Sequence, residues 1–166
     1  MTEAILEAIK GLPPPLVVAI LSALPISEVR GGIPIGYFSL DMPLSQVIPI
    51  AAVANVVSVL PVVLWFNPLA DWLMERGWLT GLVERLIKRA RSKKPMVDKY
   101  GVYAVALFVA IPLPVTGAWT GSLVAAVFEM EFWRAVACLA AGVLIACAIV
   151  TAICLAGGYA NSALAG

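Results

Sequence analysis

The sequence predicts an all-helical integral membrane protein with two inverted repeats, each a re-entrant helical hairpin followed by one transmembrane helix. Three observations indicate this fold. Of the 166 residues, 62% are hydrophobic and only 13% are charged, whereas soluble domains carry about a quarter charged residues. Residues 42–70, 102–128 and 135–166 contain no Asp, Glu, Lys or Arg. Two stretches rich in proline and glycine, residues 25–34 and 112–121, interrupt apolar sequence at corresponding places of the two halves.

The first repeat, residues 1–66 of a single membrane domain covering 1–166, begins with an expected amphipathic interfacial helix over residues 1–11. Residues 16–24 and 35–40 are then apolar runs too short to cross a bilayer. The break between them predicts a re-entrant hairpin, whose freed backbone groups must be covered by protein or line a wet cavity.

A spanning helix is expected next, over residues 44–66. Asp41 would be its N-cap and Pro43 would lie in its first turn. Pro49 and Pro61 predict kinks. Asn55 is one amide within this apolar helix, and such amides more often join two helices by a hydrogen bond than bind a ligand.

Residues 67–100 form the expected connection between the repeats. Eight of the eleven basic residues lie between Arg76 and Lys99, and this excess predicts that the connection is cytoplasmic. Within it, apolar residues recur at helical spacing opposite a basic face, which predicts an amphipathic helix lying on an anionic leaflet. The apolar set is Leu79, Leu82, Val83, Leu86, Ile87 and Ala90.

The second repeat, residues 101–166, follows the same plan. Residues 103–111 form a short apolar run, 112–121 the break and 122–128 the return, and Glu129-Met130-Glu131 opens a spanning helix from Ala135 to about Gly158. Counting crossings gives the two repeats opposite orientations, so that one hairpin enters from each side and they meet near mid-membrane. Four full crossings without hairpins are the alternative.

Glu28 and Arg30 lie inside the first break with apolar sequence on both sides, together with Gly31, Gly32 and Pro34. Ionisable residues at membrane depth are usually functional. Because desolvation favours a neutral carboxyl group, Glu28 could carry a coupling proton, and Arg30 could bind a phosphate or anionic headgroup. The alternative is an ion pair that only holds the hairpin closed.

The second break contains no charged residue. Thr116 and Thr120 supply hydroxyl groups, Gly117 and Gly121 allow close backbone approach, and Thr116 is a candidate N-cap of the returning half-helix. The N-terminus of such a half-helix favours an anion. Trp119 would line a substrate site or simply pack. Pro112 and Pro114 complete this candidate site.

Other classes of function have little support in the sequence. There is no histidine, and Cys138, Cys147 and Cys154 have no metal-ligand spacing. We find no nucleotide-binding loop, nucleophilic triad or paired catalytic acids. We therefore expect no enzyme, catalytic residue, cofactor, metal site or nucleic-acid partner, and we expect the basic helix to contact membrane lipids.

The motif Pro25-Ile26-Ser27-Glu28-Val29-Arg30-Gly31-Gly32-Ile33-Pro34 resembles the hallmark of the putative small multi-drug export proteins. The Pro-x-Pro-x-Thr-Gly-Ala-Trp-Thr-Gly stretch at 112–121 is similar to that family's second signature. The architecture also resembles DedA-type proteins, with two opposed re-entrant hairpins. That likeness implies movement of lipid-linked phosphates coupled to protons, with an acid in the first hairpin, matched by Glu28, and an arginine in the second, where this chain has Thr116 and Gly117.

Together these features predict a multi-pass cell-membrane transporter, coupled to protons through Glu28, for a small amphipathic or lipid-like substrate. The alternatives are a flippase or scramblase for anionic lipid carriers such as polyprenyl phosphates, and a structural membrane protein. Since so short a chain has little protein with which to shield wet backbone, we also expect a homodimer.

Overall fold

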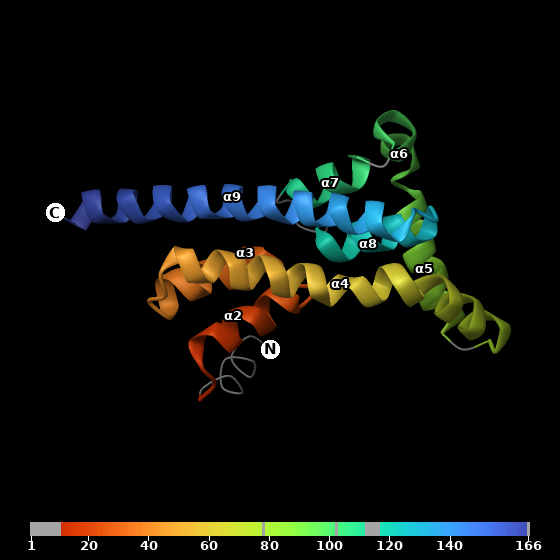
Figure 1. The fold of residues 1–166 in the computed structure, drawn as a ribbon, viewed down its shortest axis with the longest axis horizontal. Helices are drawn as coiled ribbons and strands as arrows, with labels where there is room; N and C mark the ends of the chain where they lie inside the picture. Colours follow the sequence, from red (N-terminus) through yellow and green to blue (C-terminus); the bar gives the residue numbers. More distant parts are fainter. Residues whose placement is uncertain (1–10, 78, 102, 112–116, 166) are drawn as a thin grey trace. The chain divides into compact units, whose positions relative to one another are not determined.

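The computed structural model describes residues 11–77, 79–101, 103–111 and 117–165, with side chains up to Gly157. The described residues are all-helical and contain no strand (Figure 1). They form two compact units, one of Met1–Asn55 with Cys147–Gly166 and one of Val56–Ala146. We refer to them as unit 1 and unit 2. The amphipathic helix expected over residues 1–11 lies outside the described residues, apart from Gly11.

Unit 1 is organised around two short helices, α2 (Pro14–Ala23) and α3 (Glu28–Pro34), which pack against each other. The chain continues directly from α3 into η1, a turn of π-helix over Ile35–Ser39. Val18, Ile33 and Val47 are fully buried here, and Val17 and Leu21 form an apolar cluster with parts of η1. Burial of these side chains offsets the entropy lost in ordering the hairpin.

The first break is shorter than the sequence predicts. Only Leu24–Ser27 is non-helical, because α3 runs through Gly31, Gly32 and Pro34, where a break was expected. Glycine and proline each disfavour a helix interior by about 1 to 3 kcal/mol, but packing of α3 against α2 outweighs that preference. The π-helical turn that follows Pro34 is the kind of local widening that accommodates a missing backbone donor.

In unit 2, two more short helices, α7 (Tyr103–Ala110) and α8 (Ala118–Val127), also pack against each other. The second break ends earlier than the predicted range 112–121, because Ala118–Gly121 is already helical. A Cβ added to Gly121 would lie 2.7 Å from a methyl group of Val109. Close packing of α8 on α7 therefore explains why this glycine is tolerated inside a helix.

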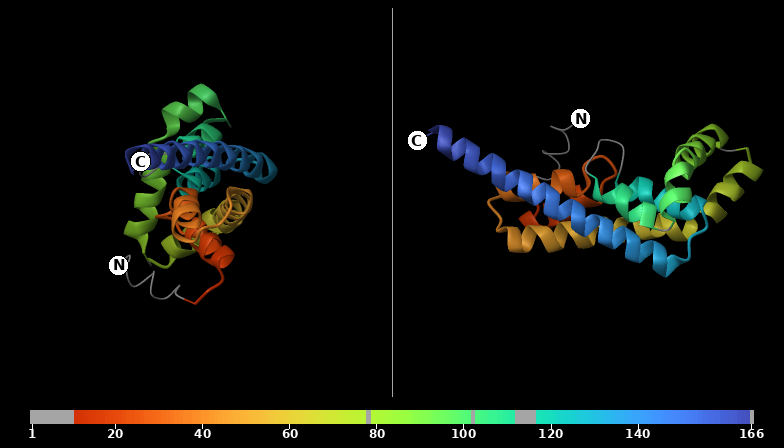
Figure 2. Two further views of the ribbon diagram at one scale, coloured as in Figure 1. Left: turned by 90° about the vertical axis from the view of Figure 1, so that its left-hand side faces the viewer. Right: turned by 90° about the horizontal axis from the view of Figure 1, so that it is seen from above.

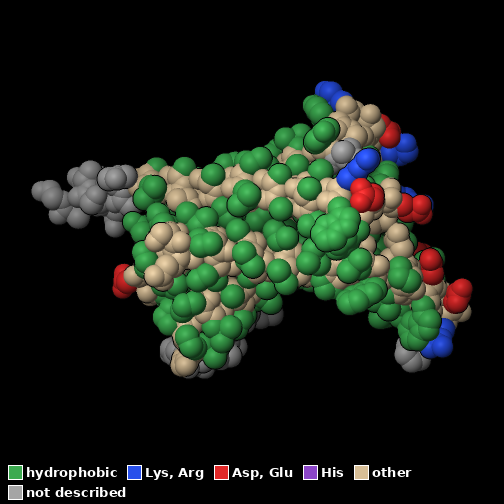
Figure 3. Space-filling model, viewed as in Figure 1, with side chains coloured by type: hydrophobic (Ala, Val, Ile, Leu, Met, Phe, Trp, Pro, Cys, Tyr) green, Lys and Arg blue, Asp and Glu red, His purple; other side chains and the backbone are tan. Residues whose placement is uncertain are grey.

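The connecting segment in unit 2 contains the predicted amphipathic helix, α5 (Thr80–Arg91). On its apolar face Val83 and Ala90 are buried, whereas Leu79 and Leu82 are exposed. A second helix, α6 (Lys94–Tyr100), was not predicted, although Pro95 in its first turn is a typical start signal. In Figure 3, acidic and basic side chains gather at the end of unit 2 that carries this connecting segment.

Two long helices contribute residues to both units, α4 (Leu44–Glu75) and α9 (Phe132–Ala165) (Figure 2). Both are long and apolar enough to cross a membrane. They expose large apolar side chains such as Val53, Trp65 and Ile153, which are 62–63% accessible. Soluble proteins rarely expose apolar surface in such amounts, and the chain is an all-helical membrane protein with two candidate spanning helices.

The first spanning helix is longer than predicted. It was expected to end at Phe66, but α4 is continuous through Pro68 to Glu75. The amide nitrogen of Asn67 donates a 2.7 Å hydrogen bond to the carbonyl oxygen of Ala126, which anchors this extension within unit 2. The kinks expected at Pro49 and Pro61 stay predictions.

Each long helix is preceded by an acidic residue with left-handed backbone, Asp41 (φ 49°) before Leu44 and Glu129 (φ 51°) before Phe132. Asp41 is therefore not the N-cap that we predicted. The amide groups of Gln46 and Val47 bond to the carbonyl of Pro43, which itself occupies the capping position. The left-handed residue instead ends the preceding helix, as glycine commonly does.

Candidate functional site

Glu28 is held at the start of α3 by the turn that joins α2 to α3. Its amide nitrogen bonds to the carbonyl of Leu24 at 3.0 Å, and the Ser27 hydroxyl donates to the carbonyl of Leu21. The backbone of Glu28 is left-handed, with φ of 49°, which costs a residue other than glycine about 1 to 2 kcal/mol. The turn thus fixes the direction of this side chain at a conformational cost.

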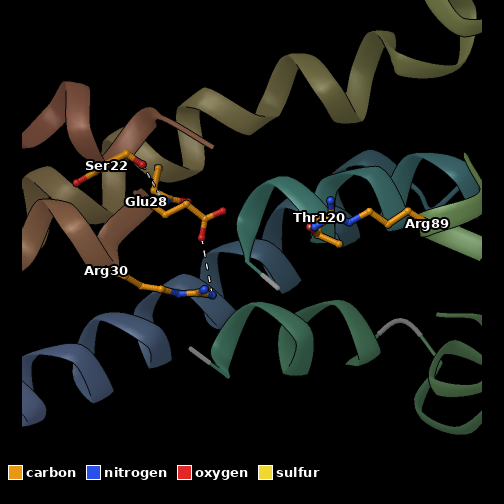
Figure 4. A network of polar contacts seen from close by, with 6 residues as sticks. Ser22, Glu28, Arg30, Arg89 and Thr120 are labelled. Carbon is orange, nitrogen blue, oxygen red and sulfur yellow. Dashed lines mark hydrogen bonds and ion pairs between the residues drawn. The ribbon is translucent and has the colours of Figure 1, made fainter. Parts of the chain in front are cut away.

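The Glu28 carboxylate forms an ion pair with Arg30 inside unit 1 (Figure 4). Their closest atoms, Oε2 and Nη2, are 3.9 Å apart, and the side chains of Glu28 and Arg30 are 9% and 23% accessible. At this distance the attraction is electrostatic rather than a direct hydrogen bond. The ion pair that the sequence analysis gave as the alternative is therefore present, and the acid is the more deeply buried partner.

Glycines allow α3 to approach α2 beside this ion pair. A Cβ added to Gly32 would lie 2.0 Å from the hydroxyl of Ser22 and 3.3 Å from the carbonyl of Val18. At Gly31 the added atom would instead meet Ser27, the N-cap of α3 itself, at 2.7 Å. Pro34 is half-buried at the end of α3. These three candidate residues shape the backbone that carries Glu28 and Arg30.

Asn55 joins α4 to the same hairpin. It is fully buried, and its amide nitrogen donates a 3.0 Å hydrogen bond to the carbonyl oxygen of Ser22 on α2. This is the helix–helix bond that sequence reasoning favoured over ligand binding. Unit 1 therefore brings together all six candidate residues of the first repeat: Glu28, Arg30, Gly31, Gly32, Pro34 and Asn55.

The second group of candidates belongs to unit 2. Gly117 and Thr120 are buried and Trp119 is half-buried, and Gly117 occupies the capping position of α8. Pro112, Pro114 and Thr116, including the predicted capping role of Thr116, lie outside the described residues.

A positive charge reaches the second group from a different helix. The guanidinium of Arg89 on α5 donates to the hydroxyl of Thr120 on α8, with 3.4 Å between Nη2 and Oγ1 (Figure 4). Sequence reasoning found no charge within residues 112–121 and assigned Arg89 to the polar face of an interfacial helix. The contact could not be predicted from the basic pattern of α5, because it depends on the packing of α5 against α8.

The candidate site contains an ion pair in unit 1 and a hydrogen bond from a guanidinium to a hydroxyl group in unit 2. The described residues contain no group of three or more His, Cys, Asp or Glu side chains that could hold a metal ion. The carboxylate of such a pair can bind a proton, and the guanidinium can bind another anion.

A protein-family model matches residues 28–149, most of the chain. The matching family is described as putative small multi-drug export protein. No protein of curated function and no solved structure matches the chain.

Proposed function

The chain belongs to the family of putative small multi-drug export proteins, and we propose that it is a proton-coupled secondary transporter. Its substrate would be a small amphipathic or lipid-like molecule, and Glu28 would carry the coupling proton. The observation that supports this most is the buried carboxylate of Glu28 beside Arg30 on a short helix that contains two glycines and a proline.

Protonation of Glu28 would remove one partner of the ion pair and leave the other charged. At 3.9 Å the attraction between two unit charges is about 4 kcal/mol in an environment of intermediate dielectric constant. Loss of that attraction would favour binding of an anionic group of the substrate by Arg30, since its planar fork suits phosphate and carboxylate. Proton binding and substrate binding would then favour the same conformational change.

We propose the inverted-repeat architecture as the frame of this mechanism, with each helix pair a re-entrant hairpin, as in DedA-type proteins. Its support is the matched order in both halves: two packed short helices, a left-handed acid and then a long helix. Cysteines at exposed Ser39 and Glu131, in a chain without native cysteines, should label from opposite sides of the membrane. Labelling from the same side would exclude inversion.

A flippase or scramblase for anionic lipid carriers is the second candidate. The contact between Arg89 and Thr120 favours it, because it supplies the second group of candidates with a cation that could meet a lipid phosphate. In this mechanism lipid would move between leaflets without a proton gradient, and Arg89→Gln would slow it more than Glu28→Gln.

Proteoliposomes distinguish the two candidates from a purely structural role. We expect a pH gradient to drive uptake of a fluorescent amphipathic anion such as anilinonaphthalene sulfonate, and Arg30→Gln to reduce that uptake. Glu75→Gln, at an exposed position near the end of α4, is the matched control and should leave uptake unchanged. Gradient-independent exchange of labelled polyprenyl phosphate would support the flippase, and no flux of either probe would refute both.

A further inference from the structure

Unit 2 contains a pocket that none of the residues discussed so far explains. Its volume is about 190 Å³, roughly the space of six liquid water molecules. It is lined by residues of α4 and α5, by the end of α8 and by Glu129, which follows the C-cap of α8. The lining residues are Asn67, Ala70, Asp71, Ile87, Arg91, Val127 and Glu129.

Three charged side chains line this pocket, Asp71, Arg91 and Glu129. None of the three side chains forms an ion pair or a hydrogen bond with another side chain in the described part of the chain. Glu131, two residues after Glu129, is by contrast paired with Arg134 at 3.2 Å. Two carboxylates and one guanidinium thus share a pocket without neutralising one another.

The backbone holds Glu129 firmly at the edge of the pocket. Its amide nitrogen bonds to the carbonyl of Ala126 at 3.0 Å, and the next amide, of Met130, bonds to Ala125 at 2.9 Å. These two bonds form a Schellman cap with Glu129 in the left-handed position. Opposite, Asn67 is fixed by its bond to Ala126, so the pocket is preorganised on two sides.

The three charged residues of the pocket are expected to lie at the same depth in the membrane. Asp71 is the first charged residue after the uncharged stretch 42–70, and Glu129 is the first after 102–128. Residues at such transitions lie at the level of the lipid headgroups. Arg91 comes from the amphipathic helix, which is itself suited to that level.

We propose that this pocket binds a headgroup that joins a primary ammonium to a phosphate, as in phosphatidylethanolamine. Asp71 and Glu129 accept hydrogen bonds from the ammonium, and Arg91 donates to the phosphate. The apolar wall of Ala70, Ile87 and Val127 contacts the ethylene link. The proposal concerns a site in unit 2 and does not depend on transport through Glu28.

The donor set selects against the other common headgroups. A trimethylated ammonium has no N–H to give to the two carboxylates, and its methyl groups need more space. A purely anionic headgroup would satisfy Arg91 but would be repelled by Asp71 and Glu129. The expected order is therefore phosphatidylethanolamine first, with phosphatidylcholine and phosphatidylglycerol both weaker.

Native mass spectrometry of the full chain, released from nanodiscs that contain equal parts of the three lipids, tests this order. We expect preferential retention of phosphatidylethanolamine, reduced about tenfold by Glu129→Gln, by Asp71→Asn and by Arg91→Gln, as for loss of one charge-assisted contact. Glu75→Gln on α4 is the matched control, because Glu75 does not line the pocket. Equal retention of the three lipids, or unchanged retention in the pocket variants, would overturn the proposal.

Two further measurements define the source and the chemistry of the ligand. If soluble phosphoethanolamine displaces the lipid, the pocket recognises this headgroup chemistry in a soluble ligand. If phosphatidylethanolamine is retained in its presence, the ligand is the lipid. Loss of retention on addition of EDTA would contradict the proposal, since it would mean that a divalent cation, not an ammonium, bridges the two carboxylates.

Discussion

Replacement of Gly32 by alanine tests the packing that holds the first hairpin together. The new Cβ would lie 2.0 Å from the Ser22 hydroxyl, and rotation of that hydroxyl would still leave Ser22 Cβ at 3.2 Å and the Val18 carbonyl at 3.3 Å. Overpacking of this kind costs about 1 to 3 kcal/mol, while alanine returns up to about 1 kcal/mol of helix propensity. We expect a net loss of about 1 to 2 kcal/mol.

Thermal unfolding in mild detergent measures this loss, as a fall in Tm of about 2 to 8 °C. Gly81→Ala is the control, because an added Cβ there has no atom within 4 Å, and we expect an unchanged or higher Tm. The double variant Ser22→Ala/Gly32→Ala should recover part of the loss, with a coupling energy of at least about 0.5 kcal/mol. An unchanged Tm for Gly32→Ala, or no recovery in the double variant, would refute the close approach of α3 to α2.

Three further changes test other parts of the two units. Glu28→Gly should be more stable than Glu28→Gln by about 1 kcal/mol and should therefore unfold at a higher temperature. Both variants lack the carboxylate, but only glycine relieves the left-handed backbone, and equal Tm values would contradict this strain. Asn55→Ala should cost about 1 to 2 kcal/mol, since it leaves the Ser22 carbonyl without its 3.0 Å donor, and a chemical unfolding curve identical to wild type would count against it. Asn67→Ala removes the 2.7 Å bond to Ala126, and we expect faster amide exchange in the last two turns of α4 and not in the first two; uniform exchange would exclude this anchor.

Much of the helical organisation could be predicted from the sequence, because it depends on local patterns. Uncharged stretches predicted the two long helices, and periodic apolar residues predicted α5. The errors occurred where tertiary contacts override local preference. Gly31, Gly32 and Gly121 were interpreted as breaks, but each lies in a helix. At Gly32 and Gly121 a small residue lets the helix approach its neighbour, and at Gly31 it leaves room for Ser27 of the same helix.

The candidate site was predictable in part for the same reason. The pairing of Glu28 with Arg30 was only an alternative, because residues two apart do not face each other on a regular helix. Asn55 was correctly expected to join two helices. The contact of Arg89 with Thr120 joins residues 31 positions apart and depends on how α5 packs against α8. No local pattern records such a contact. The homodimer and the cytoplasmic location of residues 67–100 stay predictions.

The most direct test of the proposed mechanism is proton movement in vesicles that contain Glu28→Gln. With a pH-sensitive dye inside the vesicles, an outward gradient of the amphipathic anion should produce a proton flux in the wild type and in Glu75→Gln. Glutamine preserves the size of the side chain but cannot bind or release the coupling proton. The account predicts that Glu28→Gln abolishes this flux in a protein that still folds, and a flux equal to the wild type would contradict it.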